Sequence, residues 1–344
     1  MDRQQLIQQC MAEIDTYKGG YFHSRPWLRA AFESVPREHF TPDRVWVPDR
    51  DQQRLFPVLD RTVDPQQWLE AVYSPETALI TQIEDGKVRP ENGPASSGEF
   101  TSSISCPAVV VNMLHHLNPQ PGEKILEIGT GSGYNTALLA WRVGAANVVS
   151  IEIDPDIAQS ARANLEALAS PVPTLAVGDG EHGYPHRAPF DRVISTACVR
   201  KIPPTWVQQV RPGGVILTPV TTPFGSDAIA VLTRHEGGTA RGPLVAAVDF
   251  MLVRGQRSRS PWSTLGWPRL PDFELTAAPD GQTIRQYTTA ASHNENRCHD
   301  ERNRLMGDHS KPQPAEEPKG PPDNTDGQST TVGGGDSGTH RKDK

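Results

Sequence analysis

The sequence predicts an α/β fold, a doubly wound and mostly parallel sheet, with a helical and irregular region before it and a disordered tail after it. From Thr101 onward, short apolar runs alternate with helical stretches, the pattern of parallel strands joined by right-handed crossovers. A glycine-rich turn joins the first run to the next helix. The segment 291–344 contains no Phe, Trp, Tyr or Ile, so it cannot offset the roughly 1–2 kcal/mol per residue of ordering its backbone.

Composition and charge narrow the class of protein. The formal net charge of the 344 residues is -7, which disfavours a nucleic-acid binder because no overall positive field gathers phosphates. The cysteines stand singly, so we expect neither disulfides nor a metal site. The N-terminus shows no signal peptide, and no run approaches the ~20 apolar residues of a membrane span. We therefore expect a cytoplasmic protein with no membrane partner.

The N-terminal region, 1–99, is expected to contribute to substrate binding. An amphipathic helix is predicted over 2–16, because its apolar residues recur at helical spacing. Residues 17–99 are rich in Pro and Trp and show no clear period, so we expect irregular structure. Trp27, Trp46 and Trp68 are its expected anchors.

The second region, 100–255, holds the predicted sheet. Buried strands are predicted at 124–128, 148–153, 174–177, 191–196 and 215–219, with helices at 134–143 and 155–168. Two later apolar runs, 228–233 and 244–253, have no long helix between them and predict an antiparallel hairpin at one sheet edge. An extension, 256–290, and the tail, 291–344, complete the expected organisation.

The turn after the first strand carries Gly129, Gly131 and Gly133. A dinucleotide fingerprint would continue G-x-G-x-x-G/A around a pyrophosphate, whereas here the sixth position is Tyr134. The G-x-G-x-G spacing, preceded by the acidic Glu127, favours a ligand without phosphate that has adenosine and amino-acid parts. The alternative is that these are ordinary turn glycines.

Two acidic residues follow where such a ligand would need them. Glu152 ends the next strand and can accept hydrogen bonds from both ribose hydroxyls, although it could be a surface charge. Asp179, before Gly180, can accept from the adenine amino group, although Asp-Gly is also a common turn. Together these features predict an S-adenosylmethionine site. Its expected residues are Glu127, Gly129, Gly131, Gly133, Glu152, Asp179 and Gly180.

Several sequence blocks keep their order and spacing over roughly residues 28–225. They are V-P-R-E-H-F at 35–40, S-I-S-C-P at 103–107, L-E-I-G-T-G-S-G-Y at 126–134 and A-P-F-D at 188–191. The chain thereby resembles class I S-adenosylmethionine-dependent methyltransferases with a Rossmann-like fold. More narrowly, it resembles the protein-L-isoaspartate O-methyltransferase family. The resemblance implies a peptide or protein substrate bearing an aspartyl or isoaspartyl carboxylate, with Ser103 and Ser105 on the substrate loop.

The chain departs from this family in an insertion between Phe40 and Thr101 and an extension after Pro219. These look more like the methyltransferases of ATP-grasp peptide maturation systems. That resemblance implies as substrate a ribosomal precursor peptide cyclised by an ATP-grasp ligase, methylated on an aspartate. The alternatives are housekeeping isoaspartate repair, a methyltransferase of a small metabolite or RNA, and a catalytically silent peptide-binding scaffold.

Methyl transfer to a carboxylate needs few catalytic groups. The carboxylate is already ionised at neutral pH, so no general base is required, and proximity, alignment and loss of water can supply the catalysis. Neutral donors must hold the carboxylate, and Ser105 and Ser103 are the catalytic candidates. Ser105 could instead be a helix N-cap before Pro107. Cys106 is expected to be a small buried or half-buried filler rather than a nucleophile.

Overall fold

The computed structural model describes residues 1–16, 20–168, 171–257, 262–268, 272–278 and 281–286. The predicted disordered tail, 291–344, lies outside the described residues. The chain divides into two units, 1–270 and 271–344. The second contains an antiparallel hairpin of β13 (Phe273–Ala278) and β14 (Gly281–Gln286). No strand was predicted there, and two of its apolar side chains, Leu275 and Ile284, are exposed and belong to no core.

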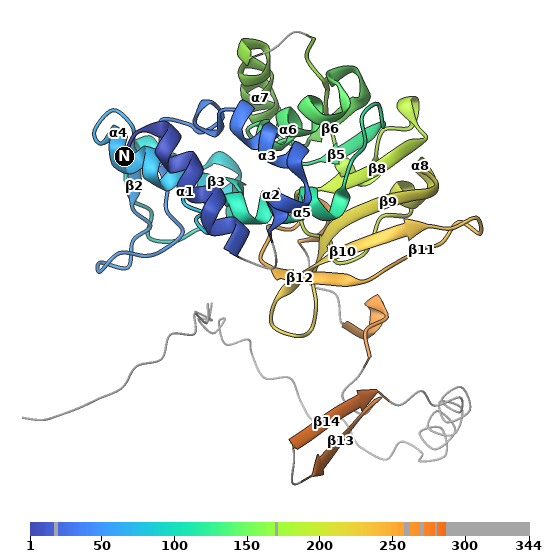
Figure 1. Ribbon diagram of the computed structural model, residues 1–344. Helices are drawn as coiled ribbons and strands as arrows, with labels where there is room; N and C mark the ends of the chain where they lie inside the picture. The colour runs from blue at the N-terminus through green and yellow to red at the C-terminus, as the bar shows by residue number, and fades with distance from the viewer. Residues whose placement is uncertain (17–19, 169–170, 258–261, 269–271, 279–280, 287–344) are drawn as a thin grey trace, which may run out of the picture. The chain divides into compact units, whose positions relative to one another are not determined.

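An eight-stranded, mostly parallel sheet forms the centre of the first unit, which confirms the predicted α/β class (Figure 1). Its order is β11-β10-β9-β8-β5-β6-β7, with β12 paired to β10. The parallel strands are β5 (Ile125–Ile128), β6 (Val148–Glu152), β7 (Thr174–Val177), β8 (Phe190–Ser195) and β9 (Val210–Val220). All five were predicted. β9 begins five residues before the predicted strand, because Val210 already pairs with Phe190 of β8.

The predicted edge hairpin is also present. β10 (Asp227–Arg234) pairs antiparallel with β9, with β12 (Leu244–Val248) and with the short β11 (Ala240–Arg241). The apolar run from 244 to 253 is not strand throughout, which corrects the prediction. Pairing with β10 ends at Val248, opposite Asp227, and the chain then leaves the sheet edge.

Helices cover both faces of the sheet. Consecutive residues of β5 point to opposite faces: Ile125 belongs to one core cluster and Leu126 to the other, as the two-residue period of a strand requires. α5 (Pro107–Leu117), α6 (Tyr134–Val143) and α7 (Pro155–Leu168) contribute to the first cluster, and α8 (Pro204–Gln209) contributes Trp206 to the second. α6 and α7 have the predicted bounds.

The N-terminal region begins with the predicted helix, α1 (Arg3–Thr16), followed by α2 (Tyr21–Ser24) and α3 (Pro26–Ser34). The rest is not irregular, which corrects the prediction. It folds as a four-stranded antiparallel sheet of order β2-β1-β3-β4, with α4 (Pro65–Val72) beside it. The strands are β1 (Arg44–Trp46), β2 (Val58–Asp60), β3 (Leu79–Ile83) and β4 (Phe100–Ile104). These strands mix buried residues with partly exposed ones, unlike the fully buried β5 and β6 of the central sheet.

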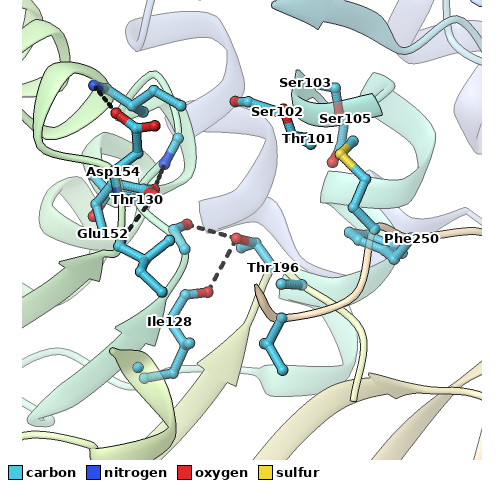
Figure 2. Close-up of a pocket in the computed structure, with 18 of the residues that line it drawn as sticks. Thr101, Ser102, Ser103, Ser105, Ile128, Thr130, Glu152, Asp154, Thr196 and Phe250 are labelled. Carbon is cyan, nitrogen blue, oxygen red and sulfur yellow. Dashed lines mark hydrogen bonds between the residues drawn. The ribbon is translucent and has the colours of Figure 1, made fainter. Parts of the chain in front are cut away.

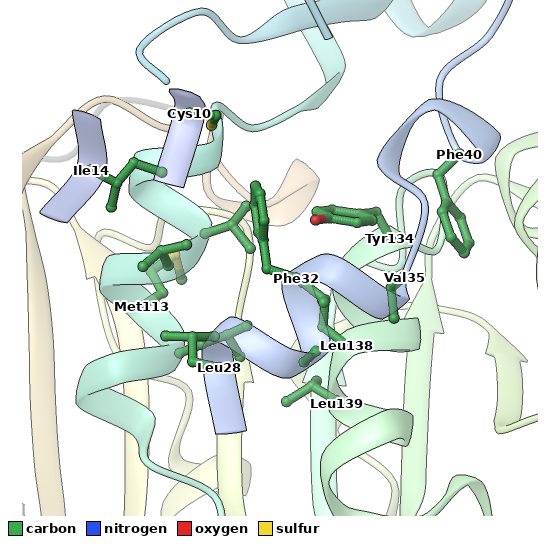
Figure 3. Close-up of a cluster of buried hydrophobic side chains, with 14 of the residues drawn as sticks. Cys10, Ile14, Leu28, Phe32, Val35, Phe40, Met113, Tyr134, Leu138 and Leu139 are labelled. Atoms are coloured by element: carbon green, nitrogen blue, oxygen red, sulfur yellow. The ribbon is translucent and has the colours of Figure 1, made fainter. Parts of the chain in front are cut away.

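One core joins the N-terminal helices to the central sheet (Figure 3). Leu28 and Phe32 of α3 lie in the same buried cluster as Met113 of α5 and Leu138 of α6. Trp46 and Trp68 are buried as expected, whereas Trp27 is half-buried. The N-terminal region is therefore a layer on the sheet rather than a separate body. Within the described ranges, no helix has the length and apolar content needed to cross a membrane.

Candidate active site

A pocket opens at the carboxyl ends of the parallel strands (Figure 2). In the strand order, β6 lies on one side of β5 and β8 on the other, so the chain connections diverge at this point. Such a switch point is where open α/β sheets bind ligands. The glycine turn follows β5 and Thr196 follows β8, and both line the pocket.

Two of the three glycines of the turn line the pocket, and the third lets two helices pack closely. All have positive φ, at 87° for Gly129, 53° for Gly131 and 94° for Gly133, a backbone conformation that glycine adopts at little cost. Gly129 and Gly131 line the pocket, but Gly133 is absent from its wall. A Cβ on Gly133 would meet Leu165 at 3.4 Å and Ala161 at 3.5 Å. Gly133 therefore lets α6 pack closely on α7.

Glu152 stands at the pocket wall where β6 ends, as predicted. One carboxylate oxygen accepts from the Gly131 amide at 2.9 Å, and the other accepts from the amides of Ile153 at 2.9 Å and Asp154 at 3.1 Å. Burial raises its pKa, and these three backbone donors act in the opposite direction. The carboxylate is thus rigidly held and ties the glycine turn to the next strand.

Glu127 lies behind the pocket rather than in its wall. Its side chain is fully buried and accepts from Asn135 at 2.7 Å, from Ser150 at 2.7 Å and from Thr136. Desolvation raises its pKa to about 7 despite these donors. Asn135 does line the pocket. Any effect of Glu127 on a ligand is therefore transmitted through the residues that it holds.

Asp179 caps a turn and also stands in the pocket wall, where the predicted adenine contact would be made. Its carboxylate accepts from the Glu181 amide at 2.9 Å, which caps a short 3-10 turn. It also lines the pocket beside Gly180. A Cβ on Gly180 would lie 2.4 Å from Ile128, so a side chain larger than hydrogen cannot be placed there without displacing the apolar wall.

The polar groups and the apolar walls of the pocket fit S-adenosylmethionine. Two carboxylates, on Glu152 and Asp179, stand in one pocket with apolar walls that include Ile128, Ile153 and Ile157. Carboxylates suit ribose hydroxyls and an adenine amino group, and apolar walls suit the faces of the adenine ring. In the part of the chain that the structure describes, no group of three or more His, Cys, Asp or Glu could hold a metal ion.

Ser103 and Ser105 line the side of the pocket opposite Glu152 (Figure 2). The N-cap of α5 is Cys106, not Ser105, so the alternative role of Ser105 as a helix cap is wrong. Among the described residues, none forms a hydrogen bond with the Ser105 hydroxyl, which leaves that group free for a ligand. Burial raises the pKa of Cys106, which fits the expected filler.

The segment Phe250–Arg257, which we call the strap, was not predicted to reach the pocket. Residues of the strap line the pocket beside the serines. Its backbone pairs with Cys198, through Cys198 N to Met251 O at 2.8 Å and Val253 N to Cys198 O at 2.9 Å. The apolar run to Val253 was visible in the sequence, but its pairing with a residue far earlier in the chain was not.

The predicted insertion and the strap meet at the pocket. Arg257 of the strap binds Asp85 of the insertion with two hydrogen bonds, at 2.9 and 3.2 Å, and Arg254 binds the same carboxylate at 3.0 Å. These arginines hold the pKa of Asp85 below its usual value. Gln82, on β3, donates to Asp154 at 3.1 Å. Both segments thus border the ligand site.

Comparison with known proteins identifies the family of this chain. The model of the protein-L-isoaspartate(D-aspartate) O-methyltransferase family matches residues 91–258. A protein-L-isoaspartate O-methyltransferase of Methanoculleus marisnigri is 36% identical over 208 residues, 60% of this chain and 92% of the relative. A protein-L-isoaspartate O-methyltransferase 1 of an Anaeromyxobacter species is 41% identical over 157 residues, 45% of this chain and 73% of the relative.

A solved structure of a protein-L-isoaspartate O-methyltransferase shares the fold, with a TM-score of 0.53 and 22% identity over 73% of this chain and 65% of that one. The relative from Methanoculleus is matched over nearly its whole length, so the similarity extends well beyond the glycine turn. This chain is a methyltransferase whose cofactor is S-adenosylmethionine, and it belongs to the protein-L-isoaspartate(D-aspartate) O-methyltransferase family.

Proposed function

We propose that this enzyme methylates a free carboxylate of isoaspartyl residues in peptides and proteins. One observation carries the proposal: the substrate-loop serines and the glycine turn face a single pocket. The Ser103 carbonyl oxygen lies 3.9 Å from the position that a Cβ on Gly131 would take. A carboxylate held by the serines is therefore placed beside the groups that we assign to the cofactor.

The residues at the site would act by binding and alignment. When bound, S-adenosylmethionine supplies an electrophilic methyl group on a sulfonium sulfur. The hydroxyls of Ser105 and Ser103 would donate to the substrate carboxylate, so that one oxygen stays free to form the new O–C bond while the S–C bond breaks. No proton is transferred in this step. Phe250 and Met251 line the same pocket and would exclude water from the reacting carboxylate.

The names of the relatives favour the isoaspartyl alternative over the cyclised-peptide interpretation. The latter rested on the insertion and the extension, and nothing in the comparisons supports an ATP-grasp ligase as a partner. We therefore place protein or peptide isoaspartate first. The cytoplasmic location inferred from the sequence remains a prediction.

A mass-spectrometric assay tests the proposal. Three substrates would be compared: an isoaspartyl peptide, the same peptide with ordinary aspartate, and an ATP-grasp-cyclised acidic peptide. We expect a gain of one methyl group on the first, followed by loss of methanol as the ester closes to a succinimide, and little change in the second. Methylation of the cyclised peptide alone would overturn the proposal in favour of peptide tailoring.

A further inference from the structure

Arg37, in the V-P-R-E-H-F block, is fully buried and is not part of the pocket wall. Its guanidinium donates from Nε to the Val72 carbonyl at 2.8 Å and from one terminal nitrogen to the Ser105 carbonyl at 2.7 Å. The other terminal nitrogen is buried with no hydrogen-bond partner. Within the described ranges, no carboxylate forms an ion pair with Arg37.

The positive charge of Arg37 is stabilised by the dipole of a helix and by an aromatic ring. Val72 is the last residue of α4, and the carboxyl end of a helix carries partial negative charge. The guanidinium carbon lies 5.1 Å from the ring centroid of Tyr134, within the range of a cation–π interaction. Tyr134 is itself the first residue of α6, directly after the glycine turn. Arg37 therefore contacts the elements on both sides of the pocket.

Burying a guanidinium without a carboxylate partner costs folding free energy. A role beyond stability would explain why Arg37 is buried here. An apolar side chain of similar size would avoid the cost of burying the charge, but it would leave the Val72 and Ser105 carbonyls without these donors. Only the planar guanidinium can donate to both carbonyls at once and in fixed directions. One of those carbonyls belongs to Ser105, whose own hydroxyl is free and whose side chain lines the pocket.

We propose that Arg37 is a positioning residue for methyl transfer, which fixes the Ser105 backbone so that the Ser105 hydroxyl meets the substrate carboxylate. The inference rests on the proposed function, in which Ser105 binds that carboxylate. Arg37 touches no reacting atom itself. By holding Ser105 against the end of α4 and resting on Tyr134, it sets the distance between the serine loop and the glycine turn.

The test compares Arg37→Lys with Arg192→Lys. Arg192 serves as the control because it donates to a backbone carbonyl, that of Leu117, at 2.6 Å and has only 15% of its side chain exposed. Unlike Arg37 it also pairs with a carboxylate, that of Glu123, and it does not line the pocket. Lysine keeps the charge but cannot hold both carbonyls of the Arg37 site. We expect Arg37→Lys to lower kcat/KM for an isoaspartyl peptide at least tenfold. Its Kd for S-adenosylhomocysteine should change less than twofold.

A double-mutant cycle separates positioning from general loss of structure. If Arg37 acts through Ser105, the variant with both Arg37→Lys and Ser105→Ala has the kcat of Ser105→Ala alone. If the two losses multiply, or if Arg192→Lys lowers kcat/KM as much as Arg37→Lys, the proposal is overturned.

Hydrogen exchange provides a readout that needs no substrate. Arg37→Lys should speed exchange of the Ile104–Cys106 amides at least fivefold over wild type, and Arg192→Lys should not. Unchanged exchange in both variants would also overturn the positioning role. A wild-type enzyme that leaves isoaspartyl peptides unmethylated would refute the proposed function instead, because the exchange experiment would still report on Arg37.

Discussion

Glu152 is the single residue whose loss tests the cofactor site most directly. Its buried carboxylate is held by three backbone amides and is the group that we assign to the ribose hydroxyls. Glu152→Ala removes these ligand contacts and frees the Gly131 amide. We expect the affinity for S-adenosylmethionine, measured by equilibrium dialysis, to fall at least tenfold. Glu166→Ala, at an exposed position of α7, is the control, and equal affinities in the two variants would refute the ribose assignment.

Glu127 gives a pH dependence with a defined sign. Its pKa rises from an ordinary value of 4.5 to about 7 in the folded protein. Between these values the folded state holds a proton that the unfolded state has released, so the free energy of unfolding falls as pH rises. A shift of this size corresponds to ~3 kcal/mol. Glu127→Gln should flatten the curve of unfolding free energy between pH 4.5 and 7 in urea titrations. A slope like that of wild type would contradict the raised pKa.

Residue types and spacing pointed to part of the pocket wall, and the family resemblance added Ser103 and Ser105, but neither predicted each residue's contacts. Glu152 and Asp179 reach the wall because they lie at the carboxyl ends of β6 and β7 in the central sheet, whereas Ser105 follows β4 of the other sheet. Gly133 and Glu127 lie in the same motif, yet they face α7 and the sheet interior. A motif fixes the order of residues along the chain. Which side of a turn each residue faces depends on the helices packed against it.

At the scale of elements, the parallel strands were predictable because they are apolar runs, and the helices between them because they carry an apolar period. The four short strands of the insertion were not. β3 and β4 pair with register shifts, which break the alternation that marks a strand. The pairing of the strap could not be predicted either, since its partner Cys198 lies far away in the sequence. Long-range pairing of short segments leaves no local pattern to detect.

The contact between the strap and Asp85 predicts an effect on ligand exchange. Asp85→Ala removes the carboxylate that both strap arginines share, so the strap should open more often. The side chains are partly exposed, and salt therefore weakens the contact. We expect S-adenosylhomocysteine to dissociate about two- to fivefold faster in stopped-flow measurements at low salt, with a smaller difference at high salt.

Asp60→Ala is the matched control for that experiment. Asp60 also belongs to the insertion and pairs with an arginine, Arg44, at 2.6 Å, but neither residue lines the pocket. Its removal should leave dissociation unchanged. If Asp85→Ala and Asp60→Ala release S-adenosylhomocysteine at the same rate at both salt concentrations, the strap contact does not govern ligand dissociation.

At the scale of the whole molecule, the N-terminal helices and the methyltransferase sheet share one core. The cluster that contains Leu6 of α1 also contains Ile194 of β8 and Val248 of β12. Because the N-terminal helices and the central sheet share this cluster, the same buried contacts are lost when either of them unfolds. The first unit should therefore unfold in a single cooperative transition, although the sequence suggested an N-terminal region of irregular structure.

Leu28→Ala tests this cooperativity. Leu28 is fully buried in the shared cluster, whereas Leu244 on β12 is 48% exposed and provides the control. Truncation of a buried leucine costs about 2–5 kcal/mol, and truncation of the exposed one should cost about 0.5 kcal/mol or less. If the core is shared, Leu28→Ala should shift the urea midpoints of tryptophan fluorescence and of S-adenosylhomocysteine release by the same amount. Because Leu28 lies in α3 and contributes nothing to the pocket wall, a shift in fluorescence without a shift in ligand release would show that the N-terminal layer opens independently.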